Sequence, residues 1–470
     1  MCKKGCCVII TDKYKIKNIS GGVPLDEGSI PKLLLGFVMP AVLGMLAGAV
    51  YNIVDRVFVG QFVGPNGLAA ISTSFPTMLM MIACSLLVGV GGSSRVAILR
   101  GARKQRPAEQ ALTHSIMMLA VMGAAFIVLS FFGLDAALRL SGASEQVLPM
   151  ARTYLRIILI GAPLALIGFG INSLIRACGS PRWAMATQMI GAVANVILDA
   201  LFIYYMNMGV AGAAWGTVIA QGISSAAGLA FFIWGDSPLK IRMHFLLRPK
   251  FKVVKKICAV GSAPFLVEFS FVIYMTVMNQ LIHKYGGDLA LSALGVFFSL
   301  DSLLFLPAMA IGEAAQPIIG YNYGARKPER VISTIKWALA MVTVFYIFSF
   351  TVAEVFTESL ISIFSTSAEL LAIGVPAMRI GYIGLIFFGM PIVTNSALQG
   401  LGKARASLLL SMARQVLFMY APLFVLPKYF GIWGVWMSFP VGDILGGILS
   451  FFFLRHLINW LRTPEAQISV

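Results

Sequence analysis

Six acidic residues lie inside long apolar stretches of this sequence, where a charge is costly. A charged side chain at bilayer depth costs about 2.5–3.5 kcal/mol, so each acid should have a partner, a proton or a cavity. Asn195 precedes Asp199 by four residues, and the two side chains therefore share one face of a helix. The six acids are Asp55, Asp199, Glu268, Asp301, Glu313 and Asp443.

Asp55, Asn195, Asp199 and Thr217 together offer carboxylate, amide and hydroxyl oxygens. A small hard cation such as Na⁺ prefers such oxygen ligands. The two carboxylates could instead share a proton, because two like charges in a low dielectric do not both ionise easily. A third interpretation is structural: Arg56 neutralises Asp55, and the polar groups only position helices. The residues alone leave these alternatives open.

The remaining acids fall in the second half of the chain. Glu268 and Asp301 are possible acids of that half, and their alternative role is a protonated or hydrogen-bonded helix contact. For Glu313, toward the cytoplasmic end of its span, we expect a structural hydrogen bond or ion pair. Asp443 is expected to pair with Arg414, because a buried charge needs a partner.

These acids must be positioned by helices that cross a membrane. Of the 470 residues, 59% are hydrophobic and 12% are charged, outside the range of soluble domains. A helix needs about 20 apolar residues to cross the hydrocarbon core. The sequence predicts twelve such spans and an all-α, polytopic membrane fold: 33–56, 67–93, 111–133, 152–175, 183–206, 210–235, 258–282, 290–319, 336–357, 374–398, 407–427 and 432–454.

The second half of the chain repeats the first. Gly-Ala-Arg-Lys at 101–104 returns at 324–327, and Asn172-Ser173 returns as Asn395-Ser396, both 223 residues later. Six spans in each half give both halves the same orientation, so we expect two pseudo-symmetric six-helix bundles around a central cavity. The expected domains are a tail (1–29), an N-lobe (30–235), a basic linker (236–256), a C-lobe (257–460) and a tail (461–470).

The net charge of +17 is explained by topology. Most Lys and Arg residues fall in alternate loops, as the positive-inside rule requires, which places both termini in the cytoplasm. A nucleic-acid protein would gather these charges with aromatics on one domain, so nucleic acid is not an expected partner. No histidine shows catalytic or metal-binding spacing, and no cofactor or enzymatic activity is expected. Cys6 and Cys7 of the N-terminal tail could form a metal or lipid site, but an incidental tail is the preferred interpretation.

Several motifs resemble one transporter family. They are Tyr51–Gly60 (YNIVDRVFVG), Gly67–Ser72 (GLAAIS), Gly-Ala-Arg-Lys in both halves, Asn172–Gly179 (NSLIRACG), and Asn195 with Asp199. Together they are similar to the multidrug and toxic compound extrusion (MATE) family, in its DinF-like branch with the MepA-type multidrug exporters. The resemblance covers nearly the whole chain, from about residue 30 to residue 460.

This resemblance implies a monomeric antiporter of the bacterial cytoplasmic membrane. It would export lipophilic organic cations in exchange for inward H⁺ or Na⁺, by alternating access of two lobes. The stretch 380–400 lacks the acid that Na⁺-coupled members carry there, which favours an N-lobe site. The alternative is a lipid-linked oligosaccharide flippase or polysaccharide exporter of the same superfamily. The implied residues are Asp55, Asn195, Asp199 and Thr217 for ion coupling, Pro40 for helix bending, and Glu268 and Asp301 as further acids.

Overall fold

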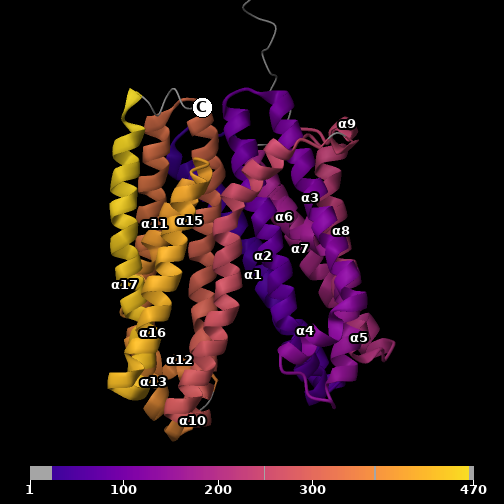
Figure 1. Ribbon diagram of the computed structural model, residues 1–470, viewed down its shortest axis with the longest axis vertical. Helices are drawn as coiled ribbons and strands as arrows, with labels where there is room; N and C mark the ends of the chain where they lie inside the picture. The colour runs from indigo at the N-terminus through magenta and orange to yellow at the C-terminus, as the bar shows by residue number, and fades with distance from the viewer. Residues whose placement is uncertain (1–23, 248, 365–366, 465–470) are drawn as a thin grey trace, which may run out of the picture.

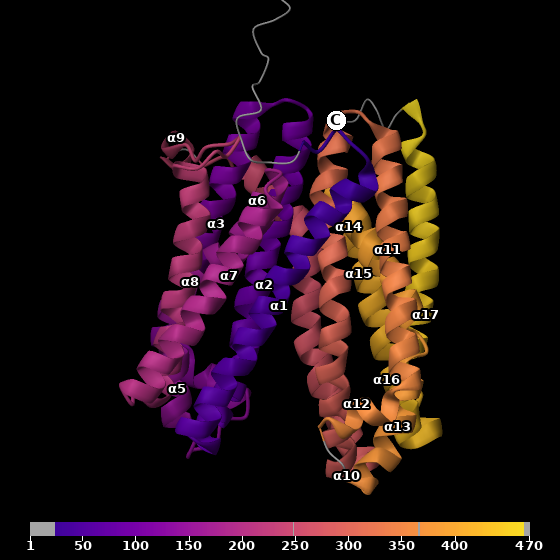
Figure 2. The ribbon, with the colours of Figure 1, turned by 180° about the vertical axis from the view of Figure 1, so that it is seen from behind.

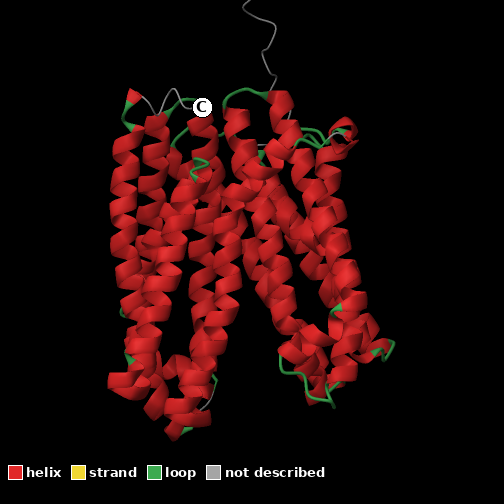
Figure 3. Ribbon diagram, in the orientation of Figure 1, coloured by secondary structure: helices red, strands yellow, loops and turns green. Residues whose placement is uncertain are grey.

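The computed structural model describes residues 24–247, 249–364 and 367–464, and all regular secondary structure within them is helical (Figure 3). Most of the predicted N-terminal tail, with Cys2, Cys6 and Cys7, and most of the C-terminal tail lie outside the described residues. The helices are α1 (Ile30–Phe62), α2 (Pro65–Gly101), α3 (Gln105–Phe132), α4 (Leu134–Leu140), α5 (Leu148–Ile160), α6 (Ala162–Ala177), α7 (Pro181–Asp199), α8 (Gly209–Ile233), α9 (Met243–Leu247), α10 (Phe251–Gly324), α11 (Pro328–Val355), α12 (Thr357–Ser362), α13 (Ala368–Tyr382), α14 (Leu385–Gly400), α15 (Ala404–Met412), α16 (Ala421–Val425) and α17 (Pro427–Leu461), with π-helical η1 (Ala200–Tyr205) and η2 (Ala413–Tyr420).

The membrane spans agree with the predicted ones. Ten helical segments of the described chain are long and apolar enough to cross a membrane, and two bent helix pairs bring the total to twelve. The pairs are α5 with α6, bent by 57°, and α13 with α14, bent by 46°. The long α10 holds two spans, because Gly287 breaks it with a positive φ of 68°. The predicted all-α, twelve-span fold is confirmed.

The helices form two lobes, α1–α8 and α10–α17 (Figure 1). The lobes lie against one another near the end where α17 finishes and diverge toward the opposite end (Figures 1 and 2). Each lobe has its own core of buried apolar side chains. Close packing of these side chains, together with hydrogen bonds between helices, therefore holds each bundle together.

Helix α1 belongs to both lobes. Its first turns, including Leu34 and Phe37, pack in the core of the C-terminal lobe, whereas Val59 near its other end packs in the N-terminal core. Figure 2 shows α1 running diagonally from one lobe to the other. Pro40 lies within the part of α1 that packs on the C-terminal lobe, between Phe37 and Val42, and α1 remains helical through it. A movement of α1 therefore reaches both bundles.

The repeat in the sequence appears as close contact between α2 and α10, where the lobes meet. A Cβ added to Gly101 would overlap the backbone oxygen of Tyr321, and a Cβ added to Gly324 would overlap that of Ile98. The two contacts are related by the same offset of 223 residues. Glycine is required at both places because backbone approaches backbone. The lobes are therefore related by an approximate two-fold axis through this interface.

Candidate functional site

Asp55, Asn195, Asp199 and Thr217 come together inside the N-terminal lobe. Asp55 lies on α1, Asn195 and Asp199 on α7, and Thr217 on α8; α7 packs against both of the other helices. All four are buried, with Asp55 7% exposed and Asp199 0% exposed. The Asn195 Nδ2 atom donates to Asp199 Oδ1 at 3.3 Å and to Thr217 Oγ1 at 3.5 Å.

The two carboxyl groups of this site are neighbours. Asp55 and Asp199 lie close enough to interact with one another. Three buried oxygens of the site have no hydrogen-bond partner in the described structure: Asp55 Oδ1, Asn195 Oδ1 and Asp199 Oδ2. Buried polar atoms are normally paired, and an unpaired one costs about 1–3 kcal/mol. This arrangement of oxygens can bind a proton or a small cation.

Local backbone geometry brings Asp199 toward its neighbours. Asp199 is the last residue of α7, and the helix continues directly as the π-helical segment η1. Such π-turns occur often at functional sites, because they re-aim side chains within a helix. On α8, Gly216 leaves room for the carboxylate, since a Cβ at this position would overlap Asp199 Oδ1. The site therefore depends on a glycine that the sequence analysis did not single out.

Two tyrosines near the site were also missed. Tyr51 and Tyr154 lie close enough to both carboxyl groups to interact with them electrostatically. Tyr51 precedes Asp55 by four residues, so helical spacing could have identified it. Tyr154 is 1% exposed and comes from α5, with no local pattern that links it to the acids.

Arg56 does not neutralise Asp55 through an ion pair. No salt bridge joins the two among the described residues, and the Arg56 guanidinium instead lies 5.8 Å from the centre of the Phe75 ring. The side chain of Arg56 is exposed, whereas that of Asp55 is buried. Consecutive residues on a helix point in different directions, which explains the separation. The purely structural interpretation of Asp55 therefore lacks a direct ion pair, although Arg56 lies close enough to act on the carboxyl group electrostatically.

The acids of the C-terminal lobe do not form a second site like that of the N-terminal lobe among the described residues. Asp443 pairs with Arg414 at 3.2 Å, as the sequence predicted, and the Arg414 guanidinium also lies 4.5 Å from the Phe388 ring centre. Asp301 on α10 is close enough to Asp443 to interact electrostatically. Glu268, also on α10, lies apart from the N-terminal site, and so does Asp301. Within the described residues, no group of three or more His, Cys, Asp and Glu side chains is placed to hold a metal ion.

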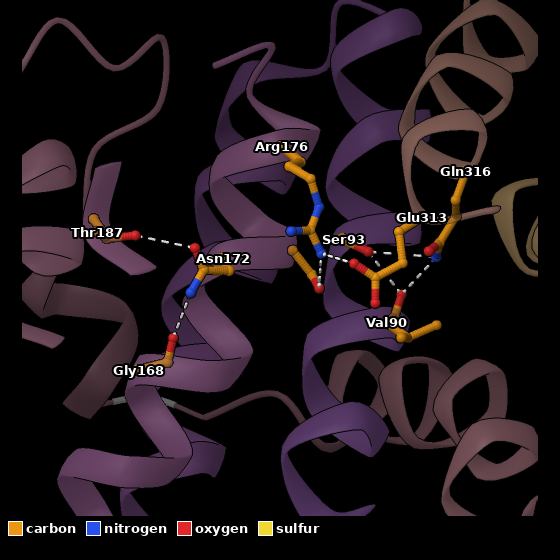
Figure 4. Close-up of polar contacts among 9 residues, drawn as sticks. Val90, Ser93, Gly168, Asn172, Arg176, Thr187, Glu313 and Gln316 are labelled. Atoms are coloured by element: carbon orange, nitrogen blue, oxygen red, sulfur yellow. Dashed lines mark hydrogen bonds and ion pairs between the residues drawn. The ribbon is translucent and has the colours of Figure 1, made fainter. Parts of the chain in front are cut away.

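Glu313 forms an ion pair that crosses between the lobes. Its Oε2 atom lies 2.6 Å from Nη2 of Arg176 on α6 (Figure 4). The sequence predicted a structural contact for Glu313 and did not identify Arg176 as its partner. Neither Arg176 nor Glu313 is among the residues that act on Asp55 and Asp199, so the pair is separate from that site.

Comparisons with known proteins agree with the fold and the repeat. The family model MatE matches residues 40–201 and again residues 264–422. The multidrug export protein MepA of Staphylococcus haemolyticus is 26% identical over 443 residues, which cover 94% of this chain and 97% of that protein. An outward-facing structure of a multidrug resistance MATE family transporter of the MOP superfamily is similar with a TM-score of 0.88 at 25% identity, covering 95% of this chain and 100% of that chain.

A second solved structure shares the fold but is described differently. A MOP superfamily transporter from Pyrococcus furiosus is similar with a TM-score of 0.89 at 24% identity, covering 95% of this chain and 100% of that chain. Its binding pocket is described as having reversed polarity, which suggests a different function for that protein. The fold itself therefore does not specify the substrate, which has to be inferred from the charged residues inside it.

Proposed function

Because this chain belongs to the MATE family of multidrug efflux transporters, we propose that it exports lipophilic organic cations in exchange for inward H⁺ or Na⁺. The lobes would alternate between access from outside and access from the cytoplasm. We assign ion coupling to Asp55, Asn195, Asp199 and Thr217. We also propose a bacterial cytoplasmic membrane location with both termini inside, supported by the placement of both described chain ends at one end of the bundle (Figure 1).

The buried oxygen cluster is the observation that carries this proposal. Asp55 and Asp199 are buried neighbours in helices long and apolar enough to cross a membrane, and three oxygens of the site lack a hydrogen-bond partner. Two adjacent carboxylates in a low dielectric cannot both stay charged without a counter-ion. An inward-moving proton or Na⁺ would neutralise them, and its release would restore their repulsion.

Either ion is compatible with this group of oxygens. Two neighbouring carboxyl groups can share one proton. A Na⁺ ion would instead collect several oxygen ligands, and the site offers three buried oxygens without a hydrogen-bond partner. Transport measured with the pH and Na⁺ gradients varied separately decides between the two ions.

Helix α1 offers a route from the ion site to the rest of the molecule. Asp55 is on α1, whose first turns pack in the core of the opposite lobe. We propose that neutralising Asp55 and Asp199 repositions α1 near Pro40 and thereby lowers the affinity for the exported compound. One charge crossing 100 mV provides about 2.3 kcal/mol, and each pH unit about 1.4 kcal/mol. These energies sustain substrate gradients of roughly ten- to hundredfold.

The unpaired charges inside the lobes favour a cationic substrate. Asp55, Asp199, Glu268 and Asp301 have no basic partner in an ion pair of the described structure. Arg414, the basic residue deep in the C-terminal lobe, is paired with Asp443. An exporter of lipid-linked pyrophosphates would instead need clustered positive charge. The excess of acids therefore supports export of organic cations.

The test uses Asp199→Asn and Asp55→Asn in proteoliposomes loaded with an ethidium-like dye. We expect both variants to insert normally and to lose gradient-driven efflux, because neither can exchange a proton or cation at the site. Asp135→Asn is the control, since Asp135 is an exposed acid of the same lobe, paired with Arg152. Efflux by Asp199→Asn at the wild-type rate, with wild-type pH and Na⁺ dependence, would remove this site from the mechanism.

A further inference from the structure

An ion pair joins the two lobes near the end where they touch. Arg176 Nη2 lies 2.6 Å from Glu313 Oε2, and the same nitrogen donates to Ser173 Oγ at 3.1 Å (Figure 4). Arg176 comes from α6 of the N-terminal lobe and Glu313 from α10 of the C-terminal lobe. The side chains are 7% and 21% exposed, so the pair is largely removed from water.

Further hydrogen bonds cross the same interface. Gln316 Nε2 on α10 donates to the backbone oxygen of Val90 at 3.2 Å and lies 3.4 Å from Ser93 Oγ, both on α2 (Figure 4). Ser94 Oγ, also on α2, donates to the backbone oxygen of Gln399 on α14. These contacts are possible only while the lobes lie against each other at this end.

The ion pair departs from the approximate two-fold symmetry. Residues 223 positions away from Arg176 and Glu313 are Gln399 and Val90, neither of which is charged. Gln316 and Ser93, by contrast, are equivalent to one another and meet at the axis. Packing inherited from the repeat would place the same contact on both sides. The single charged pair is therefore an addition to the shared interface.

A partly buried pair resists separation. When the partners part, each charge must be rehydrated or find a new partner, and a lone buried charge is strongly unfavourable. We propose that Arg176 and Glu313 form a latch that holds the cytoplasmic ends of the lobes together and must open before substrate enters from the cytoplasm. This inference rests on the proposed alternating access and assigns a positioning role to two residues outside the ion site.

Hydrogen exchange of the full-length protein in lipid nanodiscs tests the latch. Opening exposes amides only where the lobes separate. For Arg176→Gln and Glu313→Gln we expect exchange to rise at least about tenfold over 90–101 and 313–324, which corresponds to about 1.4 kcal/mol. Exchange over 50–62 and 289–305, at the opposite end, should fall because the lobes close there. General destabilisation would raise exchange at both ends and would overturn the proposal.

Two further variants keep the test informative if a single change disturbs folding. The double variant Arg176→Gln/Glu313→Gln leaves no unpaired charge and should still show the reciprocal pattern. The charge swap Arg176→Glu/Glu313→Arg should return exchange toward the wild-type level. Arg152→Gln is the matched control, because it breaks an arginine–carboxylate pair within one lobe and should leave hydrogen exchange unchanged at both ends of the lobes. An equal response of this control, or an unchanged pattern in the double variant, would refute the latch.

Failure of the latch can be separated from failure of the proposed function. If the latch variants keep wild-type exchange while Asp199→Asn abolishes efflux, the antiport proposal stands and the latch is wrong. If wild-type protein drives no efflux under any pH or Na⁺ gradient, but the variants show reciprocal exchange, the latch stands without the proposed coupling.

Discussion

The glycine beside the ion site gives a sharp test of its geometry. In Gly216→Ala, the new Cβ overlaps Asp199 Oδ1, the atom that accepts a hydrogen bond from Asn195. The carboxylate must move, and it then loses this bond. A hydrogen bond to a charged group is worth about 1.5–3 kcal/mol. Losing this bond destabilises the charged form of Asp199, so a proton shared by the two carboxyl groups should be held about 10- to 150-fold more tightly.

Overall stability should change little in this variant. Replacing glycine by alanine within a helix contributes about 1 kcal/mol of stability, which offsets part of the lost hydrogen bond. We expect a thermal midpoint near that of the wild type, together with proton-driven efflux that slows because the site releases its proton less readily. The assay is dye efflux from proteoliposomes over a series of imposed gradients.

Gly222→Ala is the matched control for Gly216→Ala. It lies on the same helix, gains the same helix propensity, and its new Cβ would meet only the tip of the Leu164 side chain. We expect wild-type gradient dependence from this control. Equal behaviour of the two variants, whether both active or both impaired, would show that the position of the Asp199 carboxylate does not govern coupling.

Two further changes test the packing of the lobes. Arg414→Met leaves Asp443 buried without its partner, so we expect stability in detergent to fall by about 3–5 kcal/mol, measured as a lower unfolding midpoint. Arg414→Met/Asp443→Leu should recover most of the loss, and no recovery would contradict this account. Gly101→Ala and Gly324→Ala should each favour separation of the lobes at the end where they touch, with similar increases in hydrogen exchange there, because each new Cβ meets a backbone oxygen that cannot turn aside. Gly36→Ala, with open space around its Cβ, should have no effect, and strongly unequal effects of the first two would argue against the approximate symmetry.

The number of membrane spans could be predicted from the sequence, but the shapes of two of them could not. The predicted spans 152–175 and 374–398 are each two helices that meet at a bend, beside Gly161 and Gly384. Mean hydropathy reports which solvent a segment prefers, so it identifies each bent pair as one continuous span and does not detect the bend. The bends depend on neighbours: Gly161 packs against Val218, and Gly384 against the backbone of α17. Such contacts are not visible in a single segment.

The candidate ion site could also be predicted only in part, because contacts between helices are not visible in a single segment. Asn195 and Asp199 are four residues apart, and their contact follows from helical geometry. Asp55 and Thr217 reach the site only because α1 and α8 pack against α7, which spacing along the chain cannot reveal. Their grouping in the sequence analysis depended on the type of residue and on the family resemblance. Tyr154 and Gly216 had neither signal and were found only in the structure.

Besides predicting two lobes, the repeat locates the axis that relates them. In an approximate two-fold arrangement, equivalent residues meet only close to the axis. Ser93 and Gln316 are 223 residues apart and lie 3.4 Å from each other, so they mark the axis. A residue near the axis therefore contacts residues that are neighbours of its own counterpart in the other lobe. Glu313 lies near the axis, and its counterpart Val90 carries no charge. Its ion pair with Arg176 is therefore an interaction that the duplication itself did not provide.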